Sequence, residues 1–257
     1  MKISDLKQEA KVNLQGKWGK TILIAIVYYL INFMLSMIGQ PITNNILKLI
    51  YSVLLIIINV PFAYGYIASL VKLSRNENVS PLDFITIGLQ SFKNSWIVIF
   101  RTVLKMLLPI ALIVASYAIL FLSAILTFKS NSSSFLVIIA FILLVGSYIY
   151  AFIKGLSYTL TSYVLYDNQD LSGKEIVEKS SELMENNKWN YIKLSLSFLL
   201  YYIVIMIVYA ILSQVANSII AVVFALIAII GISIYFLPYF NFALIAFYEK
   251  TQEKDEE

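Results

Sequence analysis

Long apolar runs separated by polar segments set the pattern of this chain. Six runs are long enough to cross a bilayer, whose hydrocarbon core of about 30 Å takes about 20 helical residues. They cover residues 21–38, 49–71, 106–128, 135–153, 194–212 and 219–242. The last two share one uncharged stretch that is too long for a single crossing and divides at SQVANS. The runs predict helices, because backbone amides inside a bilayer bond within their own segment, and they lack the alternation of transmembrane strands.

Three polar segments each predict a short amphipathic helix that leads to a tryptophan and then to a crossing. In each, a serine that would cap the helix is followed by apolar residues at helical spacing and by a tryptophan 14, 16 or 17 residues later. The serines are Ser4, Ser80 and Ser172, and the tryptophans are Trp18, Trp96 and Trp189. Pro81 and Asp83 after the second serine, and Glu175 after the third, are typical of helix starts. The apolar faces favour helices at the membrane surface, with the tryptophans as interfacial anchors.

These patterns predict an all-α polytopic membrane protein. Six transmembrane helices would form three helix hairpins, each preceded by a cytoplasmic amphipathic interfacial helix. Residues 1–257 would form a single integral membrane domain, with 1–72, 73–166 and 167–257 as repeat units. The alternative is that three inner segments occur in any six-span protein, and the low identity between the units leaves both interpretations open.

The positions of lysine and arginine predict the orientation. All of them except Lys48 and Lys129 fall in the tails and in the segments that would share one side of the membrane. Cytoplasmic loops carry the excess of positive residues, so both termini are predicted to be cytoplasmic. The outer loops QPITNN, KSNSSS and SQVANS are then very short. The N-terminus is not expected to be a signal peptide, because 20 polar-rich residues precede a first run that is itself long enough to span.

Composition excludes several kinds of chemistry. The 257 residues are 60% hydrophobic and only 13% charged, against about 25% charged in soluble domains. The chain has no Cys and no His, which removes disulfides, Cys/His zinc sites and His-based triads. No Asp or Glu lies inside a predicted span, and this argues against a proton-driven transporter. P-loop and related motifs are missing, and we expect no enzymatic activity, no cofactor and no metal.

Three cations at span ends are the candidate ligand-binding residues. Arg101 and Lys105 are four residues apart, on one face of a predicted helix, and Lys154 ends the fourth apolar run. They would contact a lipid headgroup or another anion. The alternative is snorkelling, in which a long cationic side chain simply reaches the interface. A pairing of Lys154 with Ser157 as catalytic base and nucleophile is a weaker hypothesis.

Prolines, glycines and asparagines inside the predicted spans are their remaining notable residues. Prolines and glycines inside them, including Pro61 and Gly65, mark either kinks at a substrate site or points of close packing. Asn32, Asn59 and Asn241 are expected to make hydrogen bonds between helices.

Four segments of the chain resemble a known family. They are GKWGK near the start, LVKLSRNENVSPLDF in the middle, LPYFNFALIAFYEK near the end, and above all the stretch from Lys154 to Trp189. Together they resemble the bacterial membrane family catalogued as domain of unknown function 975, over nearly the whole chain. Two departures are Tyr150–Ala151 in place of Pro-Gly, and Asn186–Asn187 in place of Gly-His. The resemblance implies an integral membrane protein of low-GC bacteria, similar to membrane regions that accompany glycerophosphodiester phosphodiesterases. It brings no established activity and no catalytic residue.

The leading functional hypothesis is a non-enzymatic protein of the bacterial cytoplasmic membrane. It would bind or handle lipid or a hydrophobic peptide in transport or envelope maintenance, or partner another membrane protein, and it would not bind nucleic acid. The acidic exposed face of the segment Ser172–Asn187 would be its docking surface. One alternative is an immunity protein that protects the cell against a membrane-active peptide. Another is a lipid-modifying membrane enzyme.

Overall fold

The computed structural model describes residues 2–130, 135–215 and 218–256, without the side chains at 128–130, at 255–256 and at most positions from 202 to 234. All regular elements in these ranges are helices, which confirms the all-α prediction. In chain order they are α1 Ile3–Leu14, α2 Trp18–Ile38, α3 Asn45–Ser74, α4 Asp83–Gln90, α5 Phe92–Ser130, α6 Phe135–Leu156, α7 Thr161–Asp167, α8 Gly173–Glu185, α9 Lys188–Val215 and α10 Ser218–Glu256.

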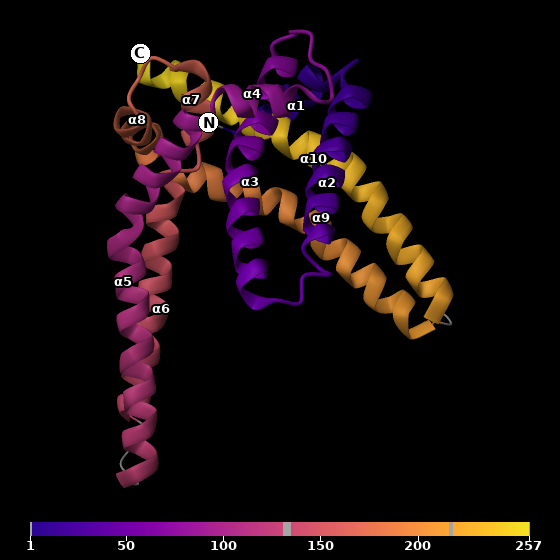
Figure 1. Ribbon diagram of the computed structural model, residues 1–257. Coiled ribbons are helices and arrows are strands. Elements are labelled where there is room, and N and C mark those ends of the chain that lie inside the picture. The colour runs from indigo at the N-terminus through magenta and orange to yellow at the C-terminus, as the bar shows by residue number, and fades with distance from the viewer. Residues whose placement is uncertain (1, 131–134, 216–217, 257) are drawn as a thin grey trace. The chain divides into compact units, whose positions relative to one another are not determined.

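The chain forms two compact units, which are described separately (Figure 1). Unit 1 consists of Met1–Trp96 and Trp189–Glu257, and unit 2 consists of Ile97–Lys188. Helix α5 therefore begins in unit 1 and continues through unit 2. The three repeat units at 1–72, 73–166 and 167–257 stay a prediction.

In unit 1, α2 and α3 form a hairpin around the loop QPITNN. Helix α3 begins at Asn45, earlier than the apolar run, because the Asn44 side chain accepts hydrogen bonds at 2.9 and 3.1 Å from two amides of the first turn. At the opposite end, Lys17 Nζ donates to the carbonyl oxygen of Ser74 at 2.8 Å. This bond satisfies one of the free carbonyls at the C-terminus of α3. It also ties the start of α2 to the end of α3.

Two glycines let α3 and α4 touch backbone to backbone. A Cβ atom at Gly65 would stand 2.0 Å from the carbonyl oxygen of Phe84, and one at Gly88 would stand 2.5 Å from that of Pro61. No real Cβ tolerates such approaches, so a larger residue at either position must push the helices apart. Gly65 is therefore a point of close packing, which is one of the two roles that the sequence leaves open.

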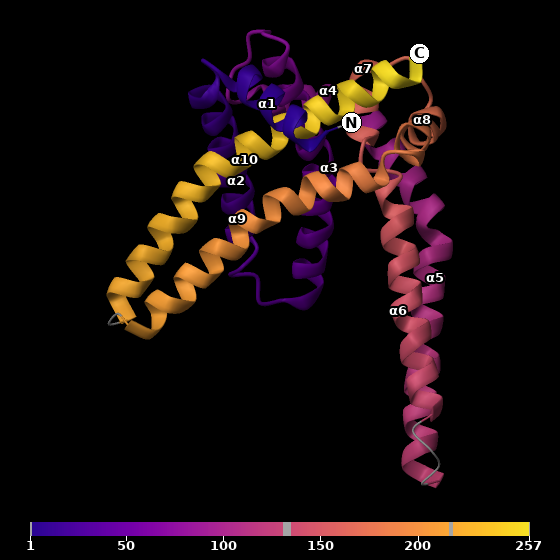
Figure 2. The ribbon, with the colours of Figure 1, turned by 180° about the vertical axis from the view of Figure 1, so that it is seen from behind.

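The apolar faces of α1 and α8 are buried within the chain, whereas that of α4 is partly exposed, with Leu82 at 54% and Leu89 at 56%. Helix α1 packs against α10 and buries Leu6, Ala10 and Leu14 completely (Figure 2). Phe84 of α4 is buried in unit 1, and in unit 2 the apolar residues of α8 are covered in part by α7. The sequence assigns the three faces to the membrane surface, but other helices of the chain cover those of α1 and α8 instead. Their location at the interface stays a prediction.

The three predicted serine caps have different outcomes. Ser172 caps α8 in a capping box with Glu175, as predicted, and hydrogen bonds from Ser172 lower the pKa of the Glu175 carboxyl. Before α4 only half of such a box is present, because the amide of Ser80 donates to the Asp83 carboxylate at 2.8 Å and the helix begins at Asp83 itself. The prediction for Ser4 is wrong, since this residue lies inside α1.

Two further hairpins complete the units. In unit 2, α5 and α6 lie side by side (Figure 1). Small residues of both helices, such as Ser116, Ala140 and Ser147, are buried, and the Ser116 hydroxyl lies 3.5 Å from the carbonyl oxygen of Leu143 on α6. Each of these serines donates to a carbonyl of its own helix, which satisfies the hydroxyl in an apolar setting. In unit 1, α9 ends and α10 begins within SQVANS, which confirms the predicted division. The predicted outer turns KSNSSS and SQVANS lie partly outside the described residues.

Four segments among the described residues are long and apolar enough to cross a membrane. They are Trp18–Ile38, Asn45–Ser74, Phe92–Thr127 and Phe135–Asp167, with mean hydropathies of 2.2 to 2.7. They correspond to the first four predicted spans, and the third segment starts at Phe92, well before the apolar run at 106–128. Because many side chains of α9 and α10 are not among the described residues, the fifth and sixth spans stay predictions.

The asparagine predictions hold for one residue of three. Asn241 of α10 donates to the hydroxyl of Tyr66 on α3 at 3.2 Å, which is a bond between helices. Asn32 and Asn59 each donate to the carbonyl four residues earlier in their own helix. A side-chain amide can satisfy itself locally in this way, so helical position alone does not predict its partner.

Candidate lipid-headgroup site

The three predicted cations lie in unit 2, at one end of the α5–α6 hairpin. Arg101 and Lys105 lie one turn apart on α5, and Lys154 lies in the last turn of α6. The Met106 Cε atom stands 3.9 Å from the position of a Cβ atom on Gly155. Since Met106 follows Lys105 and Gly155 follows Lys154, the two lysines lie at the same level of the hairpin. We call these three residues the cation group.

Arg101 is the most available member of the cation group. Its side chain is exposed and forms no ion pair or hydrogen bond with any side chain that the structure describes. A guanidinium presents five donors in a planar fork, which suits the oxygens of a phosphate. An exposed arginine beside an apolar helix surface can contact a lipid headgroup. The same position also fits snorkelling, so exposure alone does not distinguish the two interpretations.

Lys105 already has a partner within the unit. Its Nζ atom lies 3.3 Å from Glu178 Oε1 of α8, and Lys174 approaches the same oxygen at 4.0 Å. The Lys105 and Glu178 side chains are 46% and 40% exposed, so the pair stabilises the fold by at most about 1 kcal/mol. Lys105 therefore points toward α8 in this structure, and an incoming anion would compete with a carboxylate for it.

Lys154 has a weaker contact. Its ammonium lies 6.0 Å from the centroid of the Tyr158 ring, at the outer limit of a cation–π interaction. The neighbouring Ser157 is 1% exposed. Its buried hydroxyl is shielded from solvent and lipid, which weighs against the hypothesis of a Ser157–Lys154 catalytic pair.

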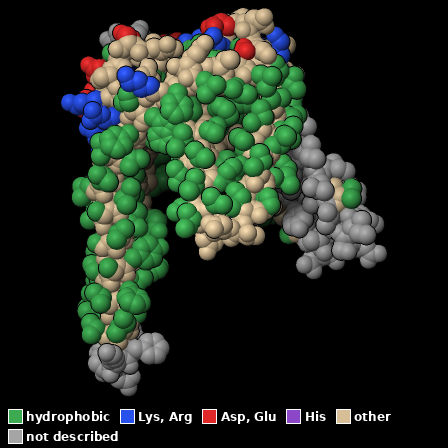
Figure 3. All heavy atoms as spheres, viewed as in Figure 1, with side chains coloured by type: hydrophobic (Ala, Val, Ile, Leu, Met, Phe, Trp, Pro, Cys, Tyr) green, Lys and Arg blue, Asp and Glu red, His purple; other side chains and the backbone are tan. Residues whose placement is uncertain are grey.

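The surroundings of the cation group are those of a bilayer boundary. Hydrophobic side chains cover α5 and α6, and charged side chains gather at the end of this hairpin next to α8 (Figure 3). Phe100, Leu108 and Phe152 are among the large apolar residues that are about 60% exposed there. A polar ligand with apolar chains, such as a phospholipid, matches both parts of this surface. No group of three or more acidic, His or Cys side chains within the described residues is placed to hold a metal ion.

The three tryptophans have different contacts, and all three lie in unit 1. Trp18 is the first residue of α2 and stacks on Tyr235, with ring centroids 5.2 Å apart. Trp189 is the second residue of α9 and is 62% exposed. Trp96 donates its indole N–H to the carbonyl oxygen of Ile57 at 3.1 Å.

The bond from Trp96 has a specific reason in the sequence. Pro61 lies inside α3, and a proline has no amide hydrogen to offer to the carbonyl four residues earlier. That carbonyl belongs to Ile57, and the indole of Trp96 supplies the missing donor. Trp96, predicted as an interfacial anchor, thus donates the hydrogen bond that Pro61 cannot donate within α3. Sequence reasoning missed this pairing and the contact of Lys105 with Glu178, because nothing in either spacing identifies a partner on another helix.

Taken by its fold, the chain is a helical protein whose described residues include four apolar helices of membrane-spanning length, as in polytopic membrane proteins. It belongs to the family described as “Protein of unknown function (DUF975)”, which matches residues 1–255. This confirms the resemblance in the sequence. Comparison with curated proteins and with solved structures finds no match.

Proposed function

We propose that this chain is a six-span protein of the bacterial cytoplasmic membrane that binds anionic lipid through the cation group and catalyses no reaction. Its termini lie in the cytoplasm. Helices α9 and α10 form the fifth and sixth spans, since each is longer than the roughly 20 residues that a crossing requires. Lipid binding serves transport or envelope maintenance.

One observation carries this proposal: an exposed arginine without a protein partner among the described residues stands where the apolar surface of α5 meets a charged end. The inner leaflet supplies anionic headgroups at this depth, and each nearby cation contributes about 1 kcal/mol of attraction. The bond from Lys17 at the start of α2 to the end of α3 supports placing these two ends on the same side of the membrane, and the excess of lysine and arginine in those segments supports the cytoplasmic side. Self-protection against a membrane-active peptide has no separate observation in its favour within the described residues.

The test is lipid binding by the purified protein, measured by native mass spectrometry with phosphatidylglycerol and phosphatidylcholine. We expect phosphatidylglycerol to bind more tightly, and the double variant R101Q/K154Q to lower its affinity about twentyfold, from about fivefold for each lost charge. The control is K48Q, which removes an exposed lysine near the start of α3. Equal affinity of the double variant and the wild type would leave only snorkelling as the role of these cations.

A further inference from the structure

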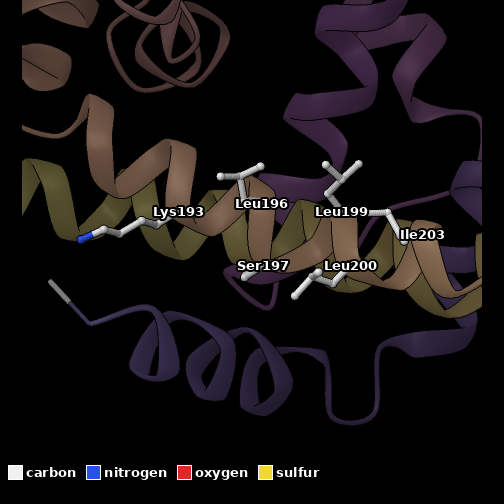
Figure 4. Close-up of a pocket in the computed structure, with 6 residues that line it drawn as sticks. All are labelled: Lys193, Leu196, Ser197, Leu199, Leu200 and Ile203. Atoms are coloured by element: carbon white, nitrogen blue, oxygen red, sulfur yellow. The ribbon is translucent and has the colours of Figure 1, made fainter.

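A shallow hollow lies on the surface of α9, in unit 1. Its volume is about 410 Å³, and its lining consists of Lys193, Leu196, Ser197, Leu199, Leu200 and Ile203 (Figure 4). This volume falls in the range of pockets for single small-molecule ligands. The four apolar side chains are all exposed, so a ligand in the hollow would replace solvent or bulk lipid.

The lining residues follow one face of the helix. Leu196, Leu199, Leu200 and Ile203 stand at positions i, i+3, i+4 and i+7, and Lys193 stands one turn before the first of them. The apolar strip from Leu196 to Ile203 is about 10 Å long, from seven steps of 1.5 Å. A cation at one end of an apolar strip along a helix matches an amphiphile that lies parallel to that helix.

A second ammonium stands near the same end. Lys7 of α1 donates from Nζ to the carbonyl oxygen of Ser197 at 3.2 Å, and the same atom is 4.5 Å from the centroid of the Phe198 ring. Lys193 itself lies 5.6 Å from the ring centroid of Trp189 and has no ion pair among the described residues.

The acidic residues of α1 are occupied by other groups. Glu9 pairs with Lys250 at 2.6 Å, and Asp5 accepts a hydrogen bond from Ser4 at 2.9 Å. Lys193 lines the hollow, and Lys7 bonds to the backbone of Ser197, another lining residue, so the charge at this end complements an anionic headgroup.

We propose that this hollow binds one anionic phospholipid, with its phosphate at Lys193 and an acyl chain along Leu196, Leu200 and Ile203. The site lies in unit 1, whereas the cation group lies in unit 2, so this inference goes beyond the proposed function and shares with it only the assumption of a membrane setting. A zwitterionic lipid fits less well, because its own ammonium faces two lysines. A single chain-like ligand is favoured over a helical peptide, because one helix alone lines the hollow.

Trp189 is the natural reporter of this site. The protein is placed in phosphatidylcholine nanodiscs and titrated with brominated phosphatidylglycerol, and the Trp189 contribution is the difference in fluorescence between the wild type and W189F. We expect quenching that saturates at a small mole fraction of the brominated lipid. K193Q is expected to lower the apparent affinity about fivefold.

Two matched comparisons separate this site from its surroundings. L200A is expected to weaken the titration, whereas L108A, at an equally exposed leucine of α5, leaves it unchanged. R101Q/K154Q is expected to leave the Trp189 titration unchanged, so failure here and failure of the proposed function give different results. Three outcomes would overturn the site: non-saturating quenching, equal quenching by brominated phosphatidylcholine, or a K193Q titration identical to that of the wild type.

Discussion

Replacing Trp96 by phenylalanine tests the account of α3 most sharply. The substitution keeps an aromatic ring but removes the indole N–H that donates to the Ile57 carbonyl at 3.1 Å. That carbonyl then has neither a helical partner, because of Pro61, nor a side-chain donor. Hydrogen bonds between helices in membrane proteins contribute about 0.6 to 1.7 kcal/mol. We therefore expect W96F to lower the free energy of unfolding by about 1 kcal/mol.

A double-mutant cycle gives this prediction its control. P61A restores a backbone amide that can bond to Ile57, so the carbonyl no longer needs the indole. W96F should then lower the free energy of unfolding much less in the P61A background than in the wild-type background. The two decreases should differ by about 1 kcal/mol. The free energies come from unfolding titrations in mixed micelles with sodium dodecyl sulfate, followed by circular dichroism. Equal costs of W96F in both backgrounds would show that the indole acts only through packing.

The remaining predictions concern other contacts in the two units. E178Q should raise the affinity for phosphatidylglycerol about two- to fivefold in native mass spectrometry, because Lys105 loses a competing carboxylate; a lower affinity would show that the ion pair positions the lysine for lipid. G65A should lower the free energy of unfolding by about 1 to 3 kcal/mol, whereas G146A, with open space around its Cβ position, should be neutral or stabilising. S172A should weaken the start of α8 and reduce its pH dependence. The fold lowers the pKa of Glu175, so the contribution of this carboxylate to the stability of α8 is present above its unfolded pKa and is lost as the pH falls through its folded pKa. Amide exchange of α8 at pH 7 and pH 3, in the wild type and in S172A, measures this contribution. An identical pH effect in both proteins would contradict the prediction.

The apolar runs were sufficient to predict the six long helices, because in a membrane protein the length of a run is itself a physical constraint, whereas α7 was not predicted. Helix ends were harder to predict. Asn44 extends α3 beyond its apolar run, and Ser4 lies inside α1 instead of capping it. Local polar residues decide such ends, and several side chains in a segment compete for the same few backbone groups.

Contacts between helices could not be predicted from spacing. The sequence shows Pro61 and Trp96 but not that the indole reaches the carbonyl left free by the proline. It shows the cation group but not that Lys105 contacts Glu178, a residue 73 positions away. The apolar faces of the short helices suit lipid and protein equally well, and only the packing of α1 on α10 shows that protein covers one of them.

The number of membrane crossings is the central claim, and the absence of native cysteine makes it directly measurable. Single cysteines are placed at Thr43 and Asn217, in two predicted outer turns, and at Ser91, between α4 and α5. Intact cells are treated with a membrane-impermeant maleimide. The six-span account predicts labelling of T43C and N217C in intact cells and of S91C only after permeabilisation. Labelling of N217C only after permeabilisation, alongside T43C from outside, would contradict it and leave four crossings.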